Sequence, residues 1–459
     1  MPFDPTIAAI RFGVGLSPDI APPASVAEIL ARLSGPDEIA TAIPIAPYSS
    51  VYPSTKDYRE ASRALNDARH TDAEAAATER QSNLRRDGRM AVLQQMQAMM
   101  ARAVGTEDGF RERLTAFWAD HFTVRATTGV NRHMVTSYIE ESIRPFVAGS
   151  FADMLVAVVT SPLMILYLDQ HQSMGPNSPA ALRRDRGLNE NLAREVLELH
   201  TLGVGGAYTQ TDVREFAELL TGVTADAERG SFFREVQAEP GSETVLGVTY
   251  GGGGESIEHV KAALRDLAVH PDTARHLARK LVVHFIGGTP DAALVDAMAT
   301  AYLDADGTLM AMYRVLLADE ASWSDETQKV KQPFDFITSS MRALGVPRSV
   351  VLGASIQQAR QLLQRPLSVM GQTWQSPVGP DGWPEEAENW ITPQGMAGRI
   401  TWAMQVPVHV LDNLPDPRDF VYSALGPKPP DAVIFAANAA ETIGDGVGIV
   451  LASAAFQRR

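Results

Sequence analysis

The stretch from Asp57 to Val104 constrains the fold most strongly, because it is almost free of residues that break helices. It is rich in alanine, arginine, glutamine and methionine, which favour a helical backbone. The stretch therefore predicts one long helix or an antiparallel pair of helices. Within it, Leu93, Met96 and Met100 recur at helical spacing, and a methionine stripe of this kind predicts core packing rather than a binding groove.

Helical patterns recur along most of the chain, so the expected fold is mainly all-α, a bundle-like body of many helices. Proline and glycine near the start predict an extended arm with one short helix around residues 25–33. Alternating β-branched residues and four consecutive glycines predict a small β-hairpin or loop excursion around residues 231–254. The predicted regions are the N-terminal arm (1–55), a helical core (56–225) with a polar helix (189–201), the β- and glycine-rich excursion (226–256), and a C-terminal helical region (257–459) with an aromatic loop (374–390).

Composition excludes several classes of protein. Acidic residues outnumber basic ones by 55 to 40, for a net charge of -15, so the long basic surface that nucleic acids need is absent. The chain has no cysteine, which excludes disulfides, thiolate metal sites and cysteine nucleophiles. Its longest apolar passage, Met154–Leu168, is too short to span a bilayer. We expect a soluble protein, cytoplasmic by default because no secretory signal is visible.

The most polar helix is expected from Glu190 to Thr201. Asn189 can cap its start, and Gly203 can take the left-handed conformation that ends a helix. At about 100° per residue, His200 points away from the stripe that carries the carboxylates. The histidine is therefore expected to make a separate contact.

Two carboxylates of this helix, Glu195 and Glu198, are the strongest candidates for chemistry. They share a stripe with Asn191, and Arg194 lies beside them. Such a pair can share a proton or bind a hard divalent cation, with Asn191 and Arg194 as ligand-binding neighbours. The alternative is a salt-bridge network in which Arg194 and other basic residues neutralise both carboxylates. No zinc-protease, di-iron, nucleotide, haem or serine-elbow motif accompanies them, so the sequence leaves metal and cofactor unknown.

Two further helices carry histidines in different surroundings. His121 lies on the apolar face of its helix, so it is either a hydrogen-bonded core residue or part of a site, whereas Asp120 is turned away from that face. In a later helix, His276 and Lys280 fall opposite the apolar face and are expected to be solvated. His284 lies at the border of that face. These histidines do not have the pattern of a metal site.

Two loops add candidates to the same cleft. A polar loop precedes the polar helix and carries Asp169, Ser173 and Asn177, which could fold over the helix. The aromatic loop holds half of the six tryptophans, so it is expected to be ordered rather than a flexible linker. Trp383 within it is a candidate for ligand binding.

The sequence resembles the bacterial domain-of-unknown-function 1800 family over nearly the whole chain. The most specific part is the polar helix from Leu188 to Gly203 with the glycine-rich turn after it. The other segments that fit the family pattern are residues 117–122, 143–145, 167–169, 173–178, 246–247, 270–274, 279–281, 331–334 and 382–384. Two positions depart from it, because Val223 stands where a tryptophan is usual and Ala238 where a histidine is frequent.

The resemblance implies a mostly helical bacterial protein, often exported to the periplasm or beyond and often encoded beside a sulfatase-like partner. It does not imply a particular reaction. If the histidine that Ala238 replaces is catalytic in relatives, this chain lacks it.

Two hypotheses follow for function. In the first, a polar cleft performs acid/base or divalent-metal-assisted hydrolysis or elimination on a polar polymer such as a carbohydrate. Its catalytic residues are Glu195, Glu198, His121 and Asp169, and its ligand-binding residues are Asn191, Arg194, Ser173, Asn177 and Trp383. In the second, the chain is a non-enzymatic assembly or accessory protein of a sulfatase-like partner, and the polar helix is a buried structural network.

Overall fold

The computed structural model describes residues 2–126, 131–183, 187–326 and 329–459, and these residues are mainly helical. The expected all-α class is therefore confirmed, with two small two-stranded antiparallel sheets beside the helices. Met1, with which the predicted arm begins, lies outside the described residues. Within the described ranges, no helix combines the length and apolar character needed to cross a membrane.

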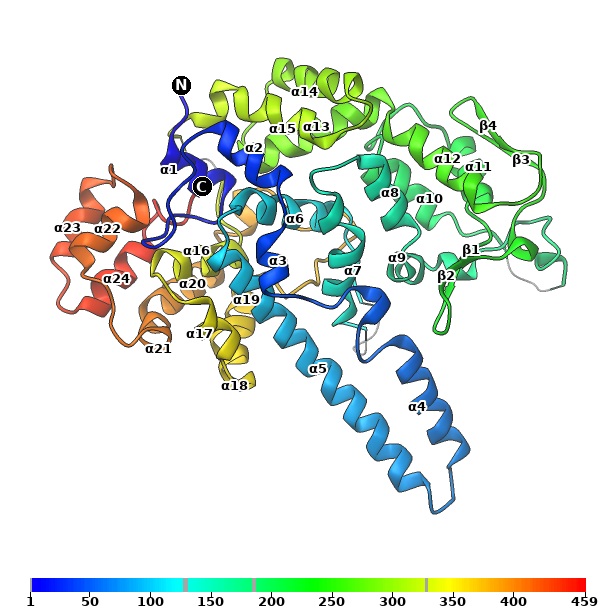
Figure 1. Ribbon diagram of the computed structural model, residues 1–459, viewed down its shortest axis with the longest axis horizontal. Coiled ribbons are helices and arrows are strands. Elements are labelled where there is room, and N and C mark those ends of the chain that lie inside the picture. Colours follow the sequence, from blue (N-terminus) through cyan, green and yellow to red (C-terminus); the bar gives the residue numbers. More distant parts are fainter. Residues whose placement is uncertain (1, 127–130, 184–186, 327–328) are drawn as a thin grey trace.

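The breaker-free stretch forms an antiparallel pair of helices, α4 (Thr55–Asp67) and α5 (Glu74–Gly105). The pair projects from the body as a long hairpin, and the C-terminal part of α5 enters the body (Figure 1). There Leu93, Met96 and Met100 are buried, which confirms that the methionine stripe is part of the core. The hairpin beyond this point presents mostly polar residues to solvent.

The helices between α5 and residue 326 form the part of the body that contains the polar helix (Figure 1). They are α6 (Gly109–His121), α7 (Met134–Ser142), α8 (Phe151–Val159), α9 (Pro162–Tyr167), α10 (Asn191–Glu195), the π-helical segment η6 (Val196–His200), α11 (Gln210–Leu219), α12 (Ile257–Ala268), α13 (Pro271–Phe285), α14 (Ala292–Asp304) and α15 (Leu309–Ala318). Two of them begin with clear side-chain caps. Thr209 starts α11 with a capping box, and His270 caps α13 ahead of Pro271.

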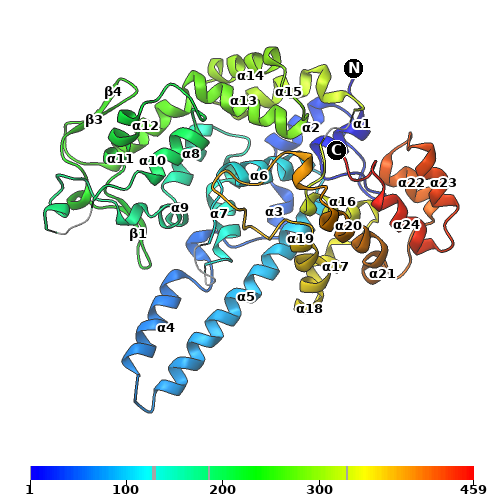
Figure 2. The ribbon, with the colours of Figure 1, turned by 180° about the vertical axis from the view of Figure 1, so that it is seen from behind.

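The remaining helices form the C-terminal end of the body. They are α16 (Pro333–Ala343), α17 (Arg348–Gly353), α18 (Ile356–Gln358), the π-helical segment η9 (Ala359–Gln364), α19 (Arg365–Val369), α20 (Pro393–Gln405), α21 (Pro407–Val410), α22 (Pro417–Leu425), α23 (Asp431–Asn438) and α24 (Ile443–Ala452). Between α19 and α20, the aromatic loop runs across α6 and α7, where it is visible from behind in orange (Figure 2).

Buried apolar side chains form two clusters. The larger cluster lies among α6 to α15 and contains Trp118 and Phe151. The smaller cluster lies between the C-terminal part of α5 and the helices α16 to α24, and contains Phe336 and Trp402. Because α5 belongs to the second cluster, a helix from the first quarter of the chain forms part of the C-terminal core.

The excursion after α11 contains two hairpins. β1 (Val223–Asp226) pairs with β2 (Gly230–Phe233), and β3 (Ser242–Val245) pairs with β4 (Val248–Gly251), both antiparallel. Leu246 and Gly247 both have positive φ, as a two-residue turn of this kind requires. The sequence predicted one hairpin or a loop, and the short β1 strand at the end of α11 escaped detection.

The N-terminal arm lies against the larger core. Besides the expected helix α2 (Val26–Ser34), it holds α1 (Pro5–Ile7), the π-helical segment η1 (Ala8–Phe12) and α3 (Glu38–Ala42). Arg11 is buried and donates hydrogen bonds to the carbonyls of Ser322 and Ser324, so it fastens the arm to the segment after α15.

Candidate functional site

The polar helix forms close to its predicted span, as α10 continued by η6 over residues 191–200. At its start the Asn189 side chain accepts a hydrogen bond from the Asn191 N–H at 3.0 Å. After its end Gly203 has a φ of 83°, in the left-handed region. A Cβ atom at Gly203 would lie 2.8 Å from Nδ1 of His276, so this glycine also lets α13 approach closely.

Arg194 neutralises two carboxylates of its own helix. Its guanidinium lies 3.1 Å from Glu190 and 3.0 Å from Glu198, one turn away on either side. The arginine side chain is 40% exposed, and the hydrogen bond with Glu198 is the main reason why the pKa of Arg194 is raised. This cluster is a half-exposed ion-pair network rather than a closed core.

Glu195 is the exception on this helix. Within the described residues its carboxylate makes no hydrogen bond or ion pair. Burial raises its pKa, and the negative charges of Glu198 and Asp381 raise it further, against the opposing charge of Arg194. Asp381 belongs to the aromatic loop, so this loop approaches the polar helix.

The candidates in the polar loop have local partners. Asp169 is exposed, with a left-handed φ of 56°, and accepts a hydrogen bond from a side chain of its own turn. The Ser173 hydroxyl accepts a hydrogen bond from the backbone N–H of Asn189, which positions the start of α10. Asn177 donates to Glu239 after the first hairpin. Within the described chain, none of these three side chains hydrogen-bonds to a carboxylate of the polar helix.

A cluster of histidines joins α6, η6 and α13. His121 is 2% exposed, its Nε2–H donates to the His200 carbonyl at 3.1 Å, and the two rings lie 6.0 Å apart. His276 lies 6.1 Å from the His121 ring and donates to the Leu199 carbonyl. Burial, with a smaller effect from Lys280, lowers the pKa of His200 to about 3 and of His276 to about 4, and lowers that of His121 well below its ordinary value. All three imidazoles are therefore neutral at pH 7.

Asp120, next to His121 on α6, faces the aromatic loop. Its carboxylate accepts a hydrogen bond from the backbone N–H of Trp383 at 2.8 Å, and it has no ion pair in the part of the chain that the structure describes. A Cβ atom at Gly382 would lie 2.7 Å from the carboxyl group, so only glycine allows this approach. Burial raises the pKa of Asp120 to about 7, although the Trp383 N–H and Lys280 oppose the shift.

A fully paired network lies beside Asp120. The Arg113 guanidinium is 2.6 Å from Asp335 and donates to Nε2 of His284 at 3.3 Å. Nδ1 of His284 and the Lys329 ammonium each lie 2.6 Å from Glu385. Burial alone would raise the pKa of Glu385, but His284 and Lys329 outweigh it and lower that pKa far below the ordinary value. Both carboxylates of this network have ion-pair partners, whereas Asp120 has none within the described residues.

Asp120 and this network border a cavity of about 130 Å³ between α6, α7, α16 and the aromatic loop. Its walls are mostly apolar and include Trp374, Trp383 and Phe334. Asp335 contributes a second carboxylate to the wall. An apolar cavity with a few convergent polar groups is the usual form of a small-molecule site, and a cavity near 150 Å³ accommodates a single ring.

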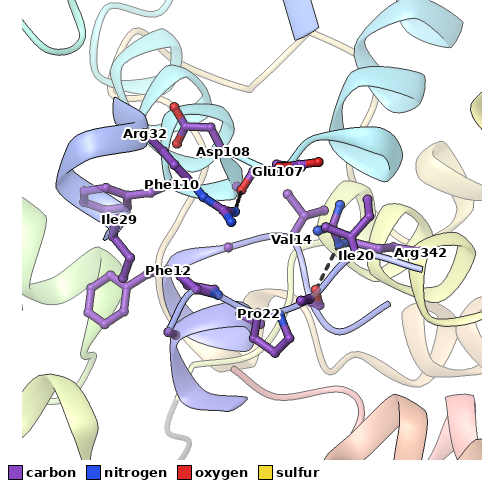
Figure 3. A pocket seen from close by; sticks show the side chains of 17 residues that line it. Phe12, Val14, Ile20, Pro22, Ile29, Arg32, Glu107, Asp108, Phe110 and Arg342 are labelled. Carbon is purple, nitrogen blue, oxygen red and sulfur yellow. Dashed lines mark hydrogen bonds between the residues drawn. The ribbon is translucent and has the colours of Figure 1, made fainter. Parts of the chain in front are cut away.

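A second, smaller cavity of about 30 Å³ lies under the N-terminal arm (Figure 3). Phe12, Val14 and Arg342 face it. The Arg342 guanidinium donates to the carbonyls of Gly15 and Val104, so its hydrogen-bonding capacity is used by the backbone. This cavity is too small for a substrate and serves the attachment of the arm.

No group of three or more histidine, aspartate and glutamate side chains within the described residues has an arrangement that could hold a metal ion. Glu195 and Glu198 therefore lack a third protein ligand among the described residues. In the histidine cluster, Nε2 of His121 and of His276 each contacts a backbone carbonyl.

The family comparison agrees with the resemblance noted in the sequence. The family described as "Protein of unknown function (DUF1800)" matches residues 8–458. The chain belongs to this family. No curated protein and no solved structure matches it. The DUF1800 match covers both hydrophobic cores and the aromatic loop, so the cavity beside Asp120 lies within the family's region.

Several expectations about this DUF1800 chain need correction or addition. His276 and Lys280 were expected to be solvated, and this is wrong, because η6 and the aromatic loop cover that face of α13. Asp120 was placed off the apolar face of α6, which is right, but its role at a cavity went unnoticed. The sequence contains a signal for this role, because Asp120 lies inside the family segment Phe117–Phe122. A second family segment, Gly382–Pro384, faces Asp120 in the structure.

Proposed function

We propose that this protein is an acid/base enzyme that acts on a ring-shaped unit of a polar polymer, with a carbohydrate as the substrate class, and that Asp120 is its catalytic acid and base. The observation that carries this proposal is the carboxyl group of Asp120, which borders a cavity, lacks an ion pair among the described residues and has a pKa of about 7. A group with such a pKa can both donate and accept a proton at neutral pH.

The cavity suits a sugar ring. Its volume of about 130 Å³ approaches that of a cavity that holds one benzene ring, and Trp374 and Trp383 in its wall supply apolar surface against which a sugar ring can pack. Asp335 provides a second carboxylate, paired with Arg113. A protonated and an ionised carboxyl group in one site is the arrangement that glycoside cleavage uses.

The proposed step uses the residues of this chain alone. Protonated Asp120 donates its proton to the leaving oxygen of the glycosidic bond as the C–O bond breaks. The Asp335 carboxylate accepts a proton from the water molecule that attacks the anomeric carbon. The histidine cluster and Lys280 lie behind Asp120, where Lys280 favours the ionised carboxylate and thereby limits its pKa.

Sugar release from a panel of polysaccharides, followed by reducing-end assay, tests the proposal. Wild-type protein should release sugar with a pH profile that falls on the basic side near pH 7, and Asp120→Asn should abolish release. Glu198→Gln is the control, because Arg194 already pairs Glu198 outside the cavity. Activity that survives Asp120→Asn, or that Glu198→Gln removes equally, contradicts the assignment.

One observation supports the alternative that the chain is an accessory protein. The α4–α5 hairpin projects from the body (Figure 1). Such a projection offers both helices to a partner, and the family resemblance suggests a sulfatase-like protein. Co-purification of the full chain with a sulfatase-like protein from the same bacterium tests this candidate. Elution of the two proteins as separate species would contradict it.

A further inference from the structure

We infer that the C-terminal end of the body carries a separate binding site for an anionic amphiphile, with its acyl chain in an apolar groove and its carboxylate or phosphate at Arg365. The groove consists of two adjoining cavities of about 440 and 340 Å³ that share Leu362 and His409 in their walls. Each volume lies within the ~300–1,000 Å³ range of small-molecule sites. The groove is distant in sequence from Asp120 and does not share a wall residue with its cavity.

The local backbone explains how the groove forms. α18, η9 and α19 follow one another as a continuous helical segment that widens to a π-helix just before Pro366. Proline has no N–H, so the carbonyl of Leu362, one turn earlier, loses its helical partner. The indole N–H of Trp402 on α20 donates to that carbonyl at 2.9 Å instead. The bond holds α20 beside the π-helical segment, and π-helical turns of this kind are frequent at functional sites.

The groove walls expose mostly apolar surface. Val350 on α17, Val369 on α19 and Val406 between α20 and α21 contribute to it, and Trp402 of α20 lines the larger cavity. Val350 is 40% exposed and Val369 is 46% exposed, so part of this apolar surface is open to solvent. Open aliphatic surface on a folded protein favours an apolar ligand, because its burial releases water.

The charge beside the groove favours a ligand with an anionic head group. From Phe336 to Pro380 the chain has no aspartate or glutamate, although the whole protein carries 55 acidic residues and a net charge of -15. The same stretch contains Arg360 and Arg365, which are exposed and make no ion pair within the described ranges. Arg365 lies at the wall of the larger cavity. An unpaired guanidinium beside an apolar groove recognises a carboxylate or phosphate with an attached alkyl chain.

Calorimetric titration of the full chain with decanoate and with decyltrimethylammonium, both below their micelle concentrations, tests the site. The two probes have the same alkyl chain and opposite charges. Decanoate should bind in a 1:1 ratio and decyltrimethylammonium should bind at least tenfold more weakly. Equal binding of the two probes, or no binding of decanoate, overturns the inference.

Variants locate the site. Arg365→Gln should weaken decanoate binding by about three- to fivefold, as expected for one partly exposed charge pair. Ala397→Glu places a carboxylate on the exposed wall of the groove and should abolish binding. Thr401→Glu, one turn further along α20, is the second variant in case Ala397→Glu reduces folding. Arg85→Gln on the projecting hairpin removes an equally exposed arginine and is the matched control. Loss of binding in the control, or retention in both glutamate variants, overturns the inference.

A second experiment distinguishes a membrane lipid from a free amphiphile as the ligand. The chain is sedimented with vesicles of phosphatidylcholine alone and with vesicles that also contain phosphatidylglycerol. Binding to the anionic vesicles that Ala397→Glu removes identifies a membrane lipid as the ligand. Binding of decanoate without vesicle binding identifies a free amphiphile. Vesicle binding that Ala397→Glu leaves intact assigns the membrane contact to another surface and overturns this one.

Discussion

The polar helix and the cavity wall on α6 both hold carboxylates, and they differ in how the charge of these groups is balanced. On the polar helix, Glu190 and Glu198 flank Arg194 at 3.1 and 3.0 Å. Asp120 on α6 receives the Trp383 N–H, borders a cavity and has no ion pair among the described residues. A carboxylate beside an arginine of its own helix has its charge balanced there, whereas one that is desolvated beside a cavity can exchange a proton near pH 7.

The largest expected effect is a difference in the rate of sugar release between a variant of Asp120 and a variant of the polar helix. Asp120→Asn should lower the rate of sugar release by about 100-fold or more, because it removes a general acid. Glu198→Gln should leave the rate within about twofold. Both are measured as kcat/KM on the same substrate. Equal losses would mean that the polar helix and the cavity act as one site.

Gly382→Ala tests the contact between the aromatic loop and Asp120. The new Cβ would lie 2.7 Å from the carboxyl group, and the glycine has a left-handed φ of 86°. We expect a loss of about 3 kcal/mol in the free energy of unfolding, from backbone strain and the clash together. Denaturant unfolding measures it, with Gly253→Ala as the control because nothing lies within 4 Å of its Cβ position. An equal loss in both variants would show that the loop does not pack on Asp120 as described.

The pH dependence of stability tests the raised pKa of Asp120. The folded value of about 7 exceeds the ordinary 3.8, so the native state binds this proton more tightly than the unfolded chain does. The stabilisation is complete below pH ~4 and is lost as the pH rises through about 7. Relative to wild type, Asp120→Asn should therefore gain on the order of 4 kcal/mol between pH 4 and 8. Parallel stability curves of the two proteins would exclude the raised pKa.

The smallest effects are expected on the polar helix. Glu198→Gln should cost about 0.5 kcal/mol, as for an exposed pair one turn apart. Glu195→Gln should be neutral or slightly stabilising, because burial and neighbouring negative charges disfavour its ionised form. Thermal unfolding at low and high salt measures both. A large loss from Glu195→Gln would reveal a structural role that its surroundings do not predict.

Much of the architecture follows from local sequence. The breaker-free stretch predicted one long helix or an antiparallel pair, and the pair α4–α5 forms. The polar helix formed within two residues of its expected ends. Methionines at helical spacing predicted the buried face of α5. These features depend on propensity, capping and periodicity, which act over a few residues.

The tertiary structure determines which polar side chains are paired with a charge and which are removed from solvent. Helical spacing placed Arg194 beside Glu198, and the sequence left open whether it neutralises the carboxylate. It could not show that Trp383, far along the chain, would meet Asp120. It also predicted solvent around His276 and Lys280, where η6 and the aromatic loop lie instead. The physical reason is that desolvation and charge pairing depend on neighbours brought from distant segments. Local sequence determines the helices, and their packing determines which carboxylate can exchange a proton.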